Sequence, residues 1–355
     1  MSGKKIVLTG GGTAGHVSPN IALLPALKEE GYDIFYIGSK TGPEKALAED
    51  AGLIYYGVST GKFRRYFDLK NFTDPFKVIK GYFEAKKILE EISPDVVFSK
   101  GGFVSVPVVR AAASLKIPCV IHESDYTPGL ANKLCFKSAK TICCNFPETV
   151  RLLPKGKSVC TGTPVRDMLK KGSRDEGKKE CGFENDKPVI MVTGGSQGAA
   201  AVNQAVREAL PELLKKYNVV HLCGKGKLDD SLIGKEGYKQ FEYVKEKMAD
   251  IFALADIVVS RAGANSIFEI LALKKPHILI PLPGGRGDQI LNARSFEAQG
   301  YSVVIMQENL TVDVLAKKID YLYENRDKYI EAMSGAGLSD SIKMVVDEIK
   351  KVSKE

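Results

Sequence analysis

A strand, a glycine-rich turn and a helix follow one another at the start of this chain, and the same order returns near its middle. The apolar residues 6–9 lead into the glycine-rich segment 10–16, and residues 189–193 lead into the similar segment 194–199. An apolar helix pattern follows each turn. Units of this kind build parallel sheets with helices on both faces. The repetition therefore predicts an α/β protein of two Rossmann-like, doubly wound domains facing each other across a cleft.

The length of the chain agrees with two domains, because 355 residues exceed what one hydrophobic core usually serves. We expect residues 1–165 to form the first domain and residues 166–340 the second. The final segment, 341–355, is expected to pack back on the first domain as a helix. The charged segment 170–187 is interpreted as a linker with one short helix.

Composition and charge indicate which kinds of ligand or surface the protein can bind. The seven cysteines are scattered and lack metal-ligand spacing, which predicts reduced thiols in a cytoplasm and no structural metal. No apolar run approaches the roughly 20 residues of a membrane span. The net charge is +8, and the basic residues are dispersed rather than grouped in a nucleic-acid-binding motif. We therefore expect phosphate ligands or an anionic membrane surface as partners, and no nucleic acid.

The first glycine turn raises the possibility of a dinucleotide site. Gly10, Gly12 and Gly15 fit the spacing of that fingerprint, which also needs an acidic residue near the end of the second strand. The second predicted strand, 34–37, ends instead in the Gly-Ser-Lys segment 38–40. Because the acid is missing, the turn is interpreted as a phosphate or acceptor loop.

Another phosphate site is predicted in residues 256–269, where a β-branched strand ends at a small-residue turn and a helix follows. Gly263 in this turn is free to adopt a positive φ and let a ligand approach the backbone. The helix start offers unpaired N–H groups and a partial positive charge to a phosphate. Glu269 lies four residues after Asn265, on the same helix face, where it can accept bonds from ribose hydroxyls. Alone, the stretch is equally compatible with a helix that carries a solvated glutamate.

Polar residues also gather where strands of the first domain are predicted to end. The strand 95–99 ends in a second glycine loop, 100–107, and the strand 119–121 ends in the His-Glu-Ser-Asp segment 122–125. Ligands of open α/β sheets bind beyond the carboxyl ends of the strands. We therefore expect these clusters to line one crevice. Glycine loops in both domains suit a ligand with a central diphosphate.

Residues 61–72 interleave four basic with four aromatic side chains. Such a segment can rest on an anionic bilayer, with its rings inserted and its cations at the headgroups. The alternative is a loop whose aromatic side chains pack on the domain below. We favour the membrane, which places the protein on the cytoplasmic face of the cell membrane.

Taken together, the motifs resemble those of the bacterial MurG family of peptidoglycan N-acetylglucosaminyltransferases, which have the glycosyltransferase-B fold. The resemblance covers essentially the whole chain, and its specificity comes from the order and spacing of motifs that are individually weak. The motifs lie at residues 11–16, 101–107, 122–125, 164–166, 194–199, 261–269 and 288–293.

The resemblance implies which residues bind the donor, UDP-N-acetylglucosamine. Ser196 and the helix start at residues 264–266 are expected at the diphosphate, Glu269 at the ribose, and Val244 at the uracil. Asp288 and Gln289 are expected at the sugar, and Arg166 is expected to reach the donor from across the cleft. The full set of expected donor-binding residues is Thr13, Ala14, Gly15, Asp125, Arg166, Ser196, Val244, Ala264, Asn265, Ser266, Glu269, Asp288 and Gln289.

The lipid-linked acceptor is expected in the first domain. There the resemblance implies roles for Thr13, Gly15 and His16, together with the loop containing Gly101, Gly102 and Ser105. Three positions depart from the family pattern. Alanine 14 stands where glycine is usual, which widens that loop slightly. Asp125 and Thr163 each stand where asparagine is common, and Asp125 can accept but not donate a bond to a sugar hydroxyl.

The implied reaction is a single inverting displacement. The C4 hydroxyl of the acceptor's N-acetylmuramoyl-pentapeptide attacks the anomeric carbon of the donor, which turns lipid I into lipid II. His16 is the expected general base, and Glu123 is the next candidate. The alternative is that His16 only orders its loop. Helix N-termini and glycine-loop N–H groups can stabilise the departing UDP, so no metal or other cofactor is expected.

Three other functions remain open at this point. A UDP-N-acetylglucosamine 2-epimerase shares the fold and the donor but has no use for a membrane-binding loop. Another lipid-directed UDP-sugar glycosyltransferase, acting for example on a diacylglycerol, differs only in its acceptor. A non-catalytic sugar-nucleotide sensor or membrane scaffold would bind the donor without turnover.

Overall fold

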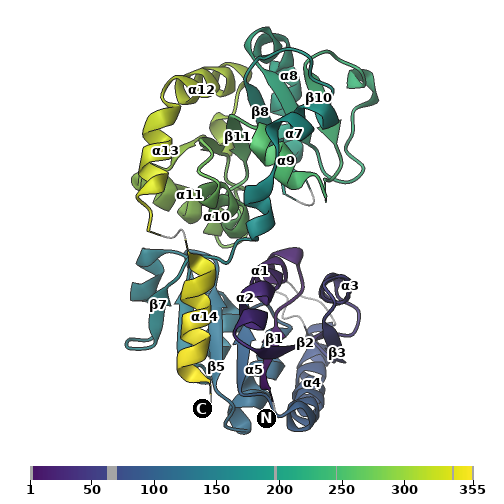
Figure 1. Cartoon of the computed structure of the whole chain (residues 1–355), viewed down its shortest axis with the longest axis vertical. Helices are drawn as coiled ribbons and strands as arrows, with labels where there is room; N and C mark the ends of the chain where they lie inside the picture. The colour runs from purple at the N-terminus through teal and green to yellow at the C-terminus, as the bar shows by residue number, and fades with distance from the viewer. Residues whose placement is uncertain (1–2, 62–69, 196–197, 245, 338–339, 354–355) are drawn as a thin grey trace. The chain divides into compact units, whose positions relative to one another are not determined.

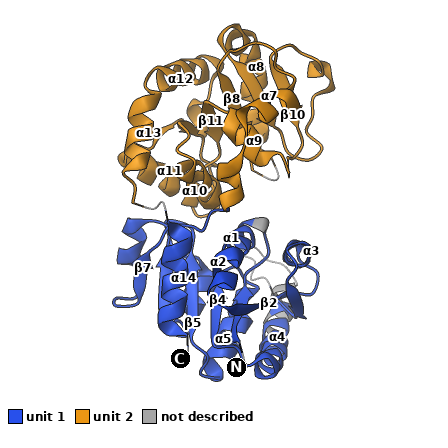
Figure 2. Cartoon of the chain, viewed as in Figure 1, with its two compact units in different colours: residues 1–166, 340–355 blue, residues 167–339 orange. Residues whose placement is uncertain are grey.

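The structure is a computed structural model that describes residues 3–61, 70–195, 198–244, 246–337 and 340–353. The chain divides into two compact units, coloured separately in Figure 2. Unit 1 comprises residues 1–166 and 340–355, and unit 2 comprises residues 167–339. The final helix thus belongs to unit 1, although the chain passes through all of unit 2 first (Figure 1).

Unit 1 is built on a parallel sheet of seven strands in the order β3-β2-β1-β4-β5-β6-β7. The strands are β1 (Lys4–Thr9), β2 (Tyr32–Ser39), β3 (Ile54–Val58), β4 (Val96–Ser99), β5 (Cys119–Glu123), β6 (Thr141–Cys144) and β7 (Ser158–Cys160). The order reverses direction between β1 and β4, whose carboxyl ends carry the two glycine loops. A doubly wound sheet binds ligands at such a switch point.

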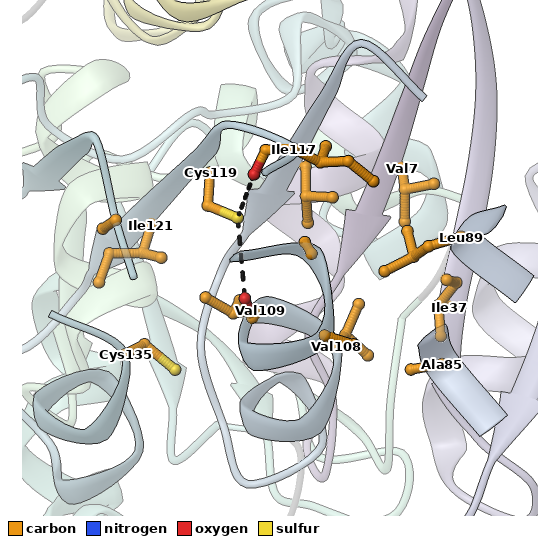
Figure 3. Packing of buried hydrophobic residues seen from close by; sticks show 14 of the residues in the cluster. Val7, Ile37, Ala85, Leu89, Val108, Val109, Ile117, Cys119, Ile121 and Cys135 are labelled. Atoms are coloured by element: carbon orange, nitrogen blue, oxygen red, sulfur yellow. Dashed lines mark hydrogen bonds between the residues drawn. The ribbon is translucent and has the colours of Figure 1, made fainter. Parts of the chain in front are cut away.

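Helices cover both faces of this sheet. One face carries α4 (Lys70–Ile92), α5 (Ser105–Ser114) and α6 (Leu130–Cys135), and Figure 3 shows part of the core beneath them. The other face carries α1 (Ser18–Ala22), α2 (Leu24–Glu29), α3 (Pro43–Asp50) and α14 (Ser341–Val352). Val7 packs in the first core, whereas its neighbours Ile6 and Leu8 pack in the second. This alternation is the pattern of a strand buried on both faces.

Proline 25 divides the first predicted helix. Residues 18–29 form two short helices, α1 and α2, with Leu23 as the cap between them. Proline cannot donate to the carbonyl four residues earlier, and its ring crowds that carbonyl, so a continuous helix is unfavourable here. Unit 1 also contains two 3₁₀ helices, η1 (Ala14–His16) and η2 (Pro147–Leu152).

Unit 2 repeats the design with six parallel strands in the order β10-β9-β8-β11-β12-β13. The strands are β8 (Val189–Thr193), β9 (Asn218–Leu222), β10 (Tyr238–Phe241), β11 (Ile257–Ser260), β12 (His277–Leu279) and β13 (Ser302–Val304). Its helices are α7 (Arg174–Cys181), α8 (Ala200–Lys216), α9 (Met248–Leu254), α10 (Ala264–Ala272), α11 (Asp288–Ala298), α12 (Val312–Glu324) and α13 (Arg326–Ser334), with the 3₁₀ helices η3 (Asp167–Lys171), η4 (Asp230–Leu232) and η5 (Gln307–Asn309). Both units therefore have the predicted doubly wound α/β architecture.

The interpretation of residues 170–187 as a linker is wrong. Both η3 and α7 pack on α9 within unit 2. Gly172 and Gly177 lie against the backbone of Ala249 and Asp250, where a side chain would collide. Arg174 is also bound to Asp256, with a shortest distance of 2.9 Å. The high charge of the segment reflects its exposed face, while its two glycines permit close helix packing.

Candidate active site

The two glycine loops of unit 1 lie against each other beyond the ends of β1 and β4. Gly102 has φ +84°, and a side chain there would collide with the carbonyl of Gly11 and come within 3.4 Å of Nδ1 of His16. A side chain at Gly10 would meet the carbonyl of His16 at 2.7 Å and Cβ of Lys100 at 3.3 Å. Only glycine allows this approach. The loops after β1 and β4 are therefore packed against each other.

A buried carboxylate holds the first glycine turn, and sequence reasoning missed it. Glu44, in the first turn of α3, accepts hydrogen bonds from the N–H groups of Gly12 at 3.1 Å and Ser39 at 3.0 Å, and from the Ser39 hydroxyl. The carboxylate of Glu44 therefore lies at the end of β2, although the last residues of that strand include no acidic side chain. Because Glu44 occupies the N–H group of Gly12, this turn is built around an internal anion. One sequence signal could have identified Glu44: it directly follows Gly42-Pro43, a pair that is typical of a helix start.

His16 ends η1 and lies against the second glycine loop. Its Nδ1 is 3.0 Å from the hydroxyl of Thr13, which fixes the orientation of the ring. Burial, and then the positive charge of Lys100, lower the pKa of His16 to about 4, against a weaker opposing effect of Glu44. The imidazole is therefore unprotonated at neutral pH. The described residues supply no hydrogen-bond partner for Nε2, which leaves that nitrogen available to a substrate hydroxyl.

Glu123 has a different environment. Its carboxylate is buried and accepts hydrogen bonds from the N–H groups of Asp125 at 3.1 Å and Gly129 at 2.8 Å, and from the amide of Asn132 at 2.9 Å. Three donors already use the lone pairs that a base needs. This geometry favours a role for Glu123 in shaping the loop that carries Asp125, which is half-buried.

Lys100 connects the strand ends of unit 1 and was not among the predicted site residues. Its ammonium group is buried and contacts Nδ1 of His122 at 2.8 Å, the Ser124 hydroxyl at 2.7 Å and the Thr163 hydroxyl at 3.0 Å. Nε2 of His122 lies 2.9 Å from the carbonyl of Gly162, which can only accept. Nδ1 of His122 is therefore an acceptor, and Lys100 donates to it.

In unit 2, α10 begins directly after the turn that follows β11. Gly263 is the N-cap residue of this helix, and the first α-helical bond joins the N–H of Ile267 to the carbonyl of Gly263. The N–H groups of Ala264, Asn265 and Ser266 are thus outside the α-helical ladder. Glu269 is half-buried one turn further along. This arrangement suits a phosphate at the helix start.

The expectation of a positive φ at Gly263 is wrong. Gly263 is extended, with φ −68° and ψ 133°. A side chain at this position would meet no atom within 4 Å. The glycine therefore keeps the space in front of the helix start open, and the turn itself does not require a left-handed backbone.

Buried polar side chains fasten this turn. Arg261 donates to the carbonyls of Ile280 at 3.0 Å and Pro281 at 3.3 Å, and to the side chain of Gln307 at 2.7 Å. Asn292 on α11 donates to the carbonyl of Ala262 at 3.1 Å. The motif residues Arg261 and Asn292 thus position the helix start rather than present their polar groups to a ligand.

The other predicted residues have the following positions. Gln289 and Asp288 begin α11, where Gln289 accepts from the N–H of Leu282 at 3.0 Å and Asp288 pairs with Arg286 at 2.8 Å. Val244 is buried beyond β10, and Arg166 ends the first stretch of unit 1.

Ser105 donates to the carbonyl of Gly102 at 2.9 Å and so belongs to the second glycine loop. Thr13 is exposed beside Gly15, the backbone of Ala14 lies in η1, and Ser196 lies outside the described residues.

Two family models match the chain. The glycosyltransferase family 28 N-terminal domain matches residues 6–144, and the glycosyltransferase family 28 C-terminal domain matches residues 189–349. The first model covers six of the seven strands of unit 1, from within β1 to the end of β6, and the second covers all six strands of unit 2 and most of α14.

Curated relatives match over almost the full length. The chain is 60% identical to the UDP-N-acetylglucosamine–N-acetylmuramyl-(pentapeptide) pyrophosphoryl-undecaprenol N-acetylglucosamine transferase of Lachnospira eligens, covering 99% of this chain and 100% of the relative. It is 54% identical to the enzyme of the same name from Clostridium tetani, covering 98% of both chains.

Solved structures agree on the fold. The crystal structure of Acinetobacter baumannii MurG superposes with a TM-score of 0.78 at 26% identity, covering 98% of this chain and 99% of that one. A UDP-GlcNAc 2-epimerase from Neisseria meningitidis reaches a TM-score of 0.70 at 13% identity, with 98% and 100% coverage. The second similarity concerns the fold alone.

Proposed function

The chain belongs to glycosyltransferase family 28, among the MurG transferases, and we propose that it transfers N-acetylglucosamine from UDP-N-acetylglucosamine to a lipid-linked N-acetylmuramoyl-pentapeptide. The product is lipid II, the precursor of peptidoglycan. The observation that carries this proposal is the 60% identity, over 99% of the chain, to a relative named for this reaction. The epimerase alternative has only the shared fold, at 13% identity, in its favour.

Unit 2 is the proposed donor site. The N–H groups at the start of α10, which lie outside the α-helical ladder, bind the diphosphate together with Ser196, and Glu269 accepts from the ribose hydroxyls. Val244 contacts the uracil through its backbone. Asp288 and Gln289 contact the sugar, for which Gln289 gives up or shares its bond to Leu282. Thr13, Ala14, Gly15, Asp125 and Arg166 approach the same donor from unit 1.

The proposed reaction needs a proton acceptor and a stabilised leaving group. Oxygen of the acceptor C4 hydroxyl forms a bond to the anomeric carbon as the bond from that carbon to the UDP oxygen breaks. Nε2 of His16 takes the hydroxyl proton, which its lowered pKa permits because the ring is unprotonated at neutral pH. The negative charge that develops on UDP faces the positive end of α10. His16 and the start of α10 thus each stabilise a charge that develops only during the displacement.

The direct test measures UDP release with and without a short-chain lipid analogue of the muramoyl-pentapeptide diphosphate. We expect release only with the acceptor, and a product heavier by one N-acetylhexosamine. Donor binding without acceptor-dependent release would contradict the proposal. Formation of N-acetylmannosamine without any acceptor would identify an epimerase instead.

We also propose that unit 1 binds an anionic membrane through α4. The predicted membrane loop, 61–72, lies mostly outside the described residues, but α4 begins within it at Lys70 and continues beyond it. Phe76, Ile79 and Phe83 are 74%, 56% and 63% exposed on this helix. Their spacing of three and four residues places them on one side of it, and Lys77 and Lys80 flank them. No helix within the described residues is long and apolar enough to cross a membrane.

Replacing both Phe76 and Phe83 by serine is expected to weaken binding to vesicles with anionic lipid at least about tenfold, because each inserted ring contributes roughly 1.5–3 kcal/mol. Sedimentation with vesicles measures the effect. Ile233→Ser, which alters a 69%-exposed residue of unit 2, is the matched control and should bind like the unaltered protein. Activity on a water-soluble acceptor should not change. Equal vesicle binding by the double variant and the unaltered protein would rule out this surface.

A further inference from the structure

Lys100 lies behind the two glycine loops, at the end of β4. Its side chain is 1% exposed, so the ammonium group has given up its hydration. Three protein acceptors replace the lost water: Nδ1 of His122 and the hydroxyls of Ser124 and Thr163, at 2.7–3.0 Å. An ammonium group has three N–H donors, and these contacts match that number. The site therefore suits a buried cation and not merely a long apolar side chain.

The backbone of Lys100 ties the same position to the first glycine turn. Its N–H donates to the carbonyl of Thr9 at 2.9 Å, at the end of β1. Gly10 follows Thr9, and a side chain on Gly10 would touch both Cβ of Lys100 and the carbonyl of His16. The imidazole of His16 itself lies against Gly102, two residues after Lys100. Lys100 thus belongs to the same closely packed pair of loops as the proposed base.

We propose that Lys100 is a positioning residue for the transfer reaction, whose buried ammonium group joins the ends of β4, β5 and the loop after β7 and keeps the nearby imidazole of His16 free of a proton. This inference rests on the role proposed for His16. A positive charge beside an imidazole disfavours a second positive charge on the ring. The base is then available to the acceptor hydroxyl even when the surrounding solution is mildly acidic.

The surroundings of Lys100 and His122 are consistent with a positive charge on Lys100 and a neutral ring on His122. Burial lowers the pKa of Lys100 to about 7, while Glu123, Asp125 and Cys143 raise it. Burial and Lys100 hold the pKa of His122 well below its usual value, so His122 adds no positive charge.

The charge of Lys100 lowers the pKa of His16, and Glu44 has the opposite effect. The pKa of Lys100, about 7, lies above that of His16, about 4, so Lys100 carries its charge where His16 titrates. Loss of this charge should therefore shift the titration of His16 to higher pH.

The test follows the imidazole of His16 by NMR in the full chain. The sequence has only four histidines, and a His16→Asn protein assigns the signal. Lys100→Met removes the charge and keeps a similar length. We expect it to raise the pKa of His16 by about one unit, so that the ring is about half protonated near pH 5. The signals of His221 and His277, which lie in unit 2, should keep their titration.

Two further variants keep the test decisive. Lys100→Gln removes the charge but keeps an N–H donor for His122, and it replaces Lys100→Met if that protein does not fold. Lys140→Met removes an exposed lysine before β6, at the opposite end of the sheet, and should leave His16 unchanged. An unchanged pKa of His16 in folded Lys100→Met or Lys100→Gln would overturn the inference.

The pH dependence of turnover separates this inference from the proposed function. With the short-chain acceptor, the acidic limb of kcat/KM should move up by the same amount in Lys100→Met as the His16 titration. An unmoved limb, with a shifted imidazole, would show that the state of His16 does not govern the reaction and would overturn the positioning role. Absence of acceptor-dependent UDP release from the unaltered protein at any pH would instead remove the proposed function, and the NMR titration would still decide whether Lys100 controls the ring.

Discussion

Replacing His16 by alanine should lower kcat by roughly 10²–10⁴-fold, because the acceptor hydroxyl loses the group that takes its proton. Binding of UDP-N-acetylglucosamine should change little, since the proposed diphosphate site is the start of α10 in unit 2. Steady-state kinetics with the short-chain acceptor and calorimetric titration with the donor measure the two effects separately. A loss confined to KM would assign His16 to binding.

His16→Asn distinguishes a base from a residue that only orders its loop. Asparagine can bond to the Thr13 hydroxyl as Nδ1 of His16 does at 3.0 Å, but it cannot take a proton at neutral pH. We expect His16→Asn to be nearly as inactive as His16→Ala. Near-wild-type turnover in His16→Asn would leave His16 with a structural role.

The pH dependence of the unaltered protein gives a second view of His16. Its pKa is lowered to about 4, so the unprotonated fraction falls only as the pH approaches 4 from above. The acidic limb of kcat/KM, which reports the free protein, should lie well below the usual pKa of histidine near 6.5. A substrate diphosphate bound near the ring would favour its protonated form, so a limb of kcat at higher pH than that of kcat/KM would show that such a group approaches His16.

Replacing Glu269 by alanine should weaken donor binding about 10- to 100-fold, because hydrogen bonds from ribose hydroxyls to a carboxylate contribute roughly 1.5–3 kcal/mol. The effect should appear in the affinity for UDP as well as for the sugar nucleotide, since the ribose is common to both. Isothermal titration calorimetry with UDP measures it. Glu236→Ala is the matched control, because Glu236 is exposed and lies before β10, at the end of the sheet opposite α10.

A donor with 2′-deoxyribose tests which part of the ligand Glu269 contacts. The unaltered protein should lose affinity for the deoxy compound, whereas Glu269→Ala should bind both donors almost equally. If the deoxy substitution costs the variant as much as the unaltered protein, Glu269 does not contact that hydroxyl.

The architecture of each unit could be predicted because it depends on local patterns. Residues 6–8 and 189–192 are all apolar, as expected of strands covered on both faces, and each run leads into a glycine turn. Proline 25 marked the division between α1 and α2 for an equally local reason, the loss of one donor. The start of α10 and the motif around His16 were likewise visible as short segments with a known physical use.

Two predictions were wrong because tertiary packing, which the sequence does not display, determined the structure. Residues 170–187 are rich in charged side chains, yet Gly172 and Gly177 allow the segment to pack on α9. Gly263 was expected to have a positive φ, but its use is to leave space before the helix start. Gly172 and Gly177 matter because of neighbours that are distant in sequence, and no local pattern records such neighbours.

The sequence by itself determined the strand and helix pattern, the two doubly wound sheets and the family, because each depends on the order of residues along the chain. Only the tertiary structure showed that Glu44 holds the glycine turn and that Lys100 reaches His122, Ser124 and Thr163. The partners in these contacts are separated by 22 to 63 residues in the sequence. A buried charged side chain is stable only where several hydrogen-bonding partners surround it. That convergence is a property of the folded sheet, where strand ends far apart in sequence become neighbours.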